Sequence, residues 1–198
     1  MFIRHLKSEP MKLFLPILLL FPILMFGQHQ TNSERFWSQL QSHCGKTYEG
    51  KITAGAVAGD GFTGEKLVMH VRSCNPNEIK IPFFVGENKS RTWILRLNAD
   101  KTIALKHDHR HPDGSEEELT QYGGTGANHG MPDVQMFPAD AHTASILPAA
   151  STNVWWFTIN ETNITYNLRR IGSDRFFSVS FDLSKTIETP EAPWGFTD

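Results

Sequence analysis

The chain has 198 residues, a formal net charge of −2 and a hydrophobic content of 39%. A nearly neutral chain of ordinary hydropathy is typical of a globular protein, whereas nucleic-acid binding goes with a strongly basic domain. We therefore expect no nucleic-acid partner.

An apolar run over residues 13–26, broken only by Pro16 and Pro22, follows a basic start. This order predicts a signal peptide over residues 1–27, because a run of about 14 apolar residues is shorter than the roughly 20 that span a membrane. Met11 is an alternative start of the same signal. We expect the protein to be exported, periplasmic or secreted, with no membrane span after signal removal. Residues 28–198 are then long enough for one domain.

Cys44 and Cys74 are the only cysteines. An oxidising compartment favours a disulfide between them. Closing a loop of about 30 residues would stabilise the fold by roughly 3 kcal/mol. Free thiols and a two-cysteine zinc site are the alternatives, although no CxxC spacing supports the zinc site.

The first predicted element is a helix over residues 33–43. Asn32 or Ser33 can cap its start, and Gly45 can end it in a left-handed conformation. Three apolar side chains form one stripe along it: Phe36, Trp37 and Leu40.

The remainder reads as short segments of alternating polarity separated by turn residues. They cover residues 47–54, 66–74, 78–85, 91–97, 102–111, 116–122, 154–159, 164–170 and 176–183. About nine strands at this spacing predict an all-β fold, an antiparallel up-and-down β-barrel with a β-sandwich as the alternative. The glycine-rich residues 123–130 open a long irregular segment, which we interpret as a flexible flap over the interior.

The layout over residues 45–184 resembles the calycin architecture shared by lipocalins and fatty-acid-binding proteins. Gly45-Lys46-Thr47-Tyr48 is similar to the Gly-x-Trp opening of lipocalins, with tyrosine in place of tryptophan and one more residue of spacing. The resemblance implies a barrel that holds a small apolar ligand. The chain also resembles uncharacterised exported bacterial proteins, which imply no function.

The segment 102–111 carries an unusual row of imidazoles. As a strand it would place on one face Ile103, Leu105, His107, His109 and His111. If the apolar pair points into a core, the histidines line its mouth. His107 and His109 would lie about 6.5–7 Å apart along the strand and could share a metal ion, zinc or another transition metal. His111 would join them only if the strand bends. The alternative is a solvated hairpin tip.

Arginines in phase with aromatic residues predict a carboxylate clamp, since a guanidinium binds both carboxylate oxygens. The resemblance to lipid-binding barrels favours Arg170 or Arg169, although both could lie on the surface. We predict these ligand-binding residues: His107, His109, Arg91, Trp93, Tyr166 and Arg170.

Three functions fit these patterns. The first is a binding protein for a small molecule, such as a lipid or carboxylate, which requires no cofactor. The second is a metal-dependent or acid–base hydrolase or isomerase that uses His107, His109 and His111. The third is a structural envelope protein with a packed core. We favour binding over catalysis.

Overall fold

The computed structural model describes residues 30–196. The signal peptide predicted over residues 1–27 lies outside the described residues. Within residues 30–196, no helix has the length and apolar character needed to cross a membrane.

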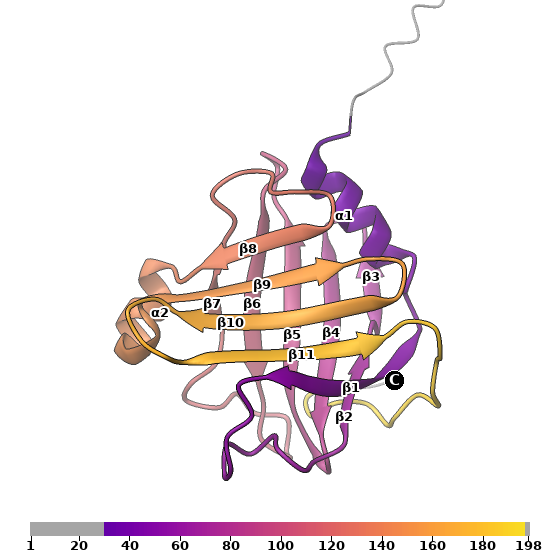
Figure 1. Ribbon diagram of the computed structural model, residues 1–198, viewed down its shortest axis with the longest axis vertical. Helices are drawn as coiled ribbons and strands as arrows, with labels where there is room; N and C mark the ends of the chain where they lie inside the picture. Colours follow the sequence, from indigo (N-terminus) through magenta and orange to yellow (C-terminus); the bar gives the residue numbers. More distant parts are fainter. Residues whose placement is uncertain (1–29, 197–198) are drawn as a thin grey trace, which may run out of the picture.

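The described chain is mostly β-structure (Figure 1). It begins with helix α1 (Asn32–Gln41). The strands are β1 (Thr47–Ala54), β2 (Leu67–His70), β3 (Ser73–Asn75), β4 (Glu78–Val85), β5 (Asn88–Leu97), β6 (Ile103–His109), β7 (Tyr122–Thr125), β8 (Val134–Pro138), β9 (Asn153–Ile159), β10 (Asn163–Arg170) and β11 (Phe176–Asp182). Between β8 and β9 lie α2 (Ala141–Ile146) and a 3₁₀ turn, η1 (Pro148–Ala150).

The strands form one antiparallel sheet that curls into a nearly closed barrel, as the sequence predicts. Their order is β7-β6-β5-β4-β2-β1-β11-β10-β9-β8, with the short β3 paired to β4 beside this path. In Figure 1 the strands β8 to β11 and β1 cross in front of the strands β2 to β7. The strand count is ten or eleven rather than nine. The segment expected over 66–74 divides into β2 and β3, and β8 lies where we expected irregular chain.

Glycines close the remaining gap between β7 and β8. A single antiparallel bridge joins Gly124 to Ala139, and any side chain at Gly124 would overlap the carbonyl of Pro138. The Thr143 hydroxyl of α2 accepts from the Gly123 N–H and donates to its carbonyl, at 2.6 and 2.7 Å. Gly123 and Gly124 therefore form a packed seam, so the flap interpretation of this segment is wrong there. Close backbone approach explains these glycines, not mobility.

Helix α1 covers one end of the barrel. Its N-cap is Thr31, not Asn32 or Ser33, because the Thr31 hydroxyl and the Glu34 carboxylate accept each other's backbone N–H in a capping box. The hydroxyl of Ser33 donates to the carbonyl of Lys101 in the β5–β6 turn. The apolar stripe Phe36, Trp37 and Leu40 is buried in the barrel core.

The predicted disulfide is present. Cys44 and Cys74 are bonded, with their Cα atoms 6.1 Å apart. The bond joins the chain just after α1 to β3, and so fixes the helix against the sheet.

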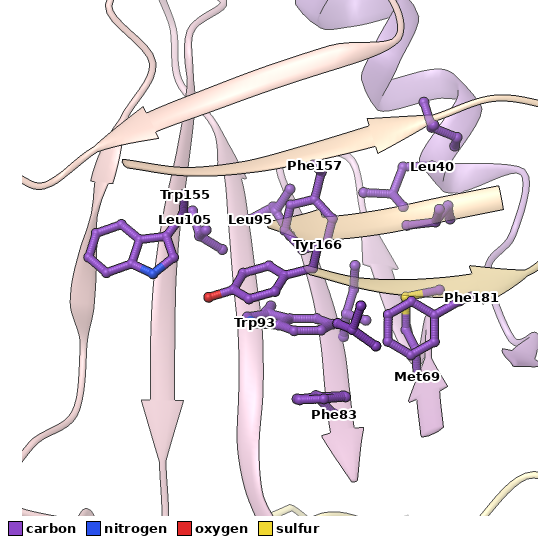
Figure 2. Packing of buried hydrophobic residues seen from close by; sticks show 14 of the residues in the cluster. Leu40, Met69, Phe83, Trp93, Leu95, Leu105, Trp155, Phe157, Tyr166 and Phe181 are labelled. Atoms are coloured by element: carbon purple, nitrogen blue, oxygen red, sulfur yellow. The ribbon is translucent and has the colours of Figure 1, made fainter. Parts of the chain in front are cut away.

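Stacked aromatic rings fill the centre of the barrel (Figure 2). Trp93 lies between Phe83 and Tyr166, with ring centroids 4.7 and 4.5 Å away. Phe157 and Phe181 meet Trp93 edge-on. Burial of each such side chain stabilises the fold by roughly 1.5–3 kcal/mol. The stack therefore contributes a large part of the free energy that holds the opposite walls of the barrel together.

Candidate functional site

A cavity of about 180 Å³ lies at the barrel end opposite α1. Its walls come from the ends of β4, β6 and β10, the starts of β5, β7, β9 and β11, and the loops around them. It is lined by Phe62, Phe83, Arg91, Thr92, Trp93, His107, His109, Tyr122, Leu147, Ala150, Asn153, Trp155, Tyr166, Leu168, Arg170, Arg175 and Phe177.

All the residues predicted to bind ligand line this one cavity: Arg91, Trp93, His107, His109, Tyr166 and Arg170. Strand register brings them together. Arg91 pairs with His109 and Trp93 with His107 across β5 and β6, so both pairs face inward. On β10, Tyr166 and Arg170 share the inward face, whereas Arg169 is exposed on the outer face.

His107 forms a buried, fully bonded part of the wall. Its Nδ1 lies 3.1 Å from the carbonyl of Tyr122, and its Nε2 lies 2.8 Å from the hydroxyl of Tyr166. Since a carbonyl only accepts, Nδ1 carries the proton and Nε2 accepts from Tyr166. Burial lowers the pKa of His107 to about 3, so the ring is neutral at physiological pH. Figure 2 shows the Tyr166 hydroxyl pointing toward Trp155.

His109 belongs to a second chain of polar contacts, one hydrogen bond and one ion-pair contact, that leads from the surface into the cavity. Its Nε2 lies 3.1 Å from the hydroxyl of Tyr122, and its Nδ1 lies 3.6 Å from the carboxylate of Glu117. Burial lowers the pKa of His109, and the neighbouring Arg91 lowers it further. Burial raises the pKa of Tyr122 to about 12. His109 therefore lies within hydrogen-bond reach of the Tyr122 hydroxyl, with which it can exchange a proton, and the carboxylate of Glu117 lies on its other side.

Three arginines surround the mouth of the cavity, and no aspartate or glutamate is among the lining residues. Arg91 and Arg170 are half-buried and Arg175 is exposed. The side chain of Arg91 donates to the Asn88 side-chain oxygen, and that of Arg170 donates to Asn153. Burial lowers the pKa of Arg91, yet a guanidinium remains charged in proteins. The lining of the mouth therefore carries a net positive charge, and the nearest acidic group given for it is Glu117, whose carboxylate lies 3.6 Å from Nδ1 of His109.

The three imidazoles do not come together as a metal site. His107 uses both ring nitrogens within the wall, and His111 is exposed beyond the end of β6. In the described part of the chain, no group of three or more His, Cys, Asp or Glu side chains is placed to hold a metal ion. A bend at Pro112 was the condition for His111 to join the other two histidines, but the strand ends at His109, before the third member of the row.

Several lining residues were missed from the sequence. Tyr122 lies at the end of a segment expected to be a strand over 116–122, but β7 starts at Tyr122 itself. Phe62 comes from the glycine-rich loop after β1, stacks on Phe83 and packs at a tilt against Phe177. Arg175 follows a surface turn. Of these three lining residues, only Phe62 could have been predicted, because it is an isolated aromatic residue in a glycine-rich loop.

No family model, no curated protein and no solved structure matches the chain. The site therefore rests on its own geometry, an aromatic cavity with an arginine rim at one end of a nearly closed antiparallel barrel.

Proposed function

We propose that the protein is an exported binding protein that holds a small, partly apolar ligand in the barrel interior. One observation carries the proposal: a single cavity combines a deep aromatic wall with a rim of three arginines and no carboxylate. Ligand sites typically combine apolar walls with a few polar groups that fix orientation.

The lining residues differ in exposure between the inner end of the cavity and its mouth. Its inner walls are almost inaccessible, with Trp93 at 3%, His107 at 5% and Tyr166 at 7% exposure. Its arginines lie nearer the solvent. The apolar part of a ligand would therefore lie inside and its polar end at the mouth. Arg91 and Arg170 would bind this polar end, whereas neutral His107 would only shape the wall.

Two features support export. The Cys44–Cys74 disulfide is typical of an oxidising compartment, and an apolar run with a basic start precedes residue 27.

The proposal is tested with a thermal-shift screen of small apolar anions against the wild type and Ala150→Leu. Ala150 lines the cavity and is 1% exposed, so leucine there fills the space without removing a charge. We expect some anions to raise the Tm of the wild type but not that of Ala150→Leu. Equal shifts in both proteins would place binding elsewhere. If no compound shifted the Tm of either protein, the result would favour the alternative of a structural envelope protein with a packed core.

A second candidate function is acid–base catalysis, favoured by the chain from Glu117 through His109 to Tyr122. Glu117 would orient His109, whose Nε2 would take or return the proton of the Tyr122 hydroxyl facing the cavity. Turnover of a small aryl ester such as phenyl acetate, lowered at least about tenfold in His109→Asn, would support it. A rate equal to buffer alone would leave binding as the function.

A further inference from the structure

We infer that the ligand is a single-ring aromatic monocarboxylate, an inference that rests on the binding function proposed above. Cavity size, wall rigidity, wall chemistry and rim charge each narrow the ligand class, and all four agree on this one.

Cavity size sets the upper limit. A dry apolar cavity of about 150 Å³ holds one benzene molecule, and drug-sized ligands use about 300–1,000 Å³. At about 180 Å³, this cavity has room for one ring and a short substituent. The stacked rings of Phe83, Trp93 and Tyr166 occupy the space behind it, so a long acyl chain has nowhere to extend.

The walls are flat and mutually locked. Tyr122 stacks on His107, with ring centroids 4.7 Å apart, and Trp155 packs against both rings. Because each ring is held by others, the walls do not rearrange around a flexible chain. A planar ring can stack offset or edge-on against such surfaces.

The deep wall offers few polar groups to a ligand. The polar atoms of His107 and Tyr166 already bond to each other and to the Tyr122 carbonyl. A hydroxyl-rich ligand such as a sugar would lose its hydrogen bonds to water there without replacement. The inner half of the ligand is therefore unsubstituted hydrocarbon.

The rim selects a net negative charge. Arg91, Arg170 and Arg175 line the mouth, and a guanidinium has five N–H donors, of which the structure commits one from Arg91 and one from Arg170 to other side chains. A carboxylate accepts paired N–H groups well. An ammonium group on the same ligand would meet these three arginines, and the carboxylate of Glu117, beside His109, would offset only part of their charge. The site therefore discriminates an aromatic acid from an aromatic amino acid.

The test compares ligands that differ in one property. We use isothermal titration calorimetry at neutral pH with 3-phenylpropanoate, with phenylalanine, which adds only an ammonium group, and with saturated carboxylates of increasing chain length. We expect 3-phenylpropanoate to bind one per chain and phenylalanine to bind at least about tenfold more weakly. The affinity of the saturated acids should not rise along the series.

Four results would overturn the inference. Equal binding of phenylalanine would refute selection of a monoanion. A gain of about fourfold in affinity per added methylene, continuing to long chains, would show a lipid carrier, which leaves the binding function intact but not this ligand class. If no ring compound binds while other anions shift the Tm of the wild type and not of Ala150→Leu, the class is again wrong and the function stands. If nothing binds in either experiment, both fail.

Variants on one strand provide the matched control. Arg91→Gln removes the half-buried rim charge, and we expect 3-phenylpropanoate to bind about 10- to 100-fold more weakly. Arg96→Gln removes an arginine of the same strand that is exposed and paired with Glu78, and should leave affinity unchanged. Equal losses of affinity in the two variants would show that the net charge of the protein attracts the ligand, not a binding site at Arg91. Should Arg91→Gln fail to fold, the ligand series on the wild type still decides.

Discussion

Replacing Tyr166 with phenylalanine probes the wall of the cavity directly. The substitution keeps the ring that stacks on Trp93 at 4.5 Å, so little packing is lost. It removes only the hydroxyl that donates to Nε2 of His107 at 2.8 Å. Both residues are buried, so the histidine nitrogen keeps no partner. Leaving a buried acceptor unsatisfied costs about 1–3 kcal/mol.

The assay is urea unfolding followed by tryptophan fluorescence, with the free energy of unfolding taken from midpoint and slope. Tyr48→Phe is the matched control, since it removes a hydroxyl 2.7 Å from Nδ1 of His43, which is only half-buried and can bond water instead. We expect Tyr166→Phe to lose about 1–3 kcal/mol and Tyr48→Phe clearly less, with slopes unchanged. If Tyr166→Phe left the free energy of unfolding unchanged, or if both variants lost equal amounts, the assigned His107 tautomer and its buried hydrogen bond would be refuted.

Three more predictions concern stability. Gly124→Ala should destabilise the barrel by more than about 3 kcal/mol, because its methyl would overlap the Pro138 carbonyl. Gly126→Ala, whose nearest atoms lie at 3.3 Å, should cost much less, and equal midpoints in urea would contradict the seam. Folded His107 has its pKa lowered from 6.5 to about 3, whereas the unfolded chain takes up the proton near 6.5. Stability should therefore fall as the pH drops from 6.5 towards 3, by about 1.4 kcal/mol per unit. His107→Gln should show a shallower slope, and an identical slope would assign the titration to other groups. Replacing Cys44 and Cys74 with serine should cost about 3–4 kcal/mol, and dithiothreitol should lower the midpoint of the wild type only.

Period-two alternation was sufficient to predict the inward face of the site. Ile103, Leu105, His107 and His109 share one face of β6 in the structure, because the pleat leaves no other choice once the apolar pair enters the core. The same argument placed Arg91 with Trp93, and Tyr166 with Arg170. What alternation could not supply was the pairing of β5 with β6 and the approach of β10 across the barrel. It is this approach that brings the Tyr166 hydroxyl to His107.

The glycines show the opposite case. A run of Gly123-Gly124-Thr125-Gly126 is compatible with a flexible loop and with a tight seam, because both need residues without a side chain. The sequence alone does not distinguish them, since the deciding contact comes from Pro138, on a strand that alternation did not reveal.

The burial of Asp108 could not be predicted from alternation either. Asp108 lies on the outward face of β6, yet it is fully buried and forms an ion pair with Arg110 at 3.0 Å.

Intermolecular nuclear Overhauser effects between 3-phenylpropanoate and the protein test the central claim most directly. Our account predicts contacts from the ligand ring to Trp93, Trp155 and Phe177, which line the cavity. Contacts to Trp156 and Phe176 instead would contradict it, since these rings stack 6.1 Å apart outside the cavity.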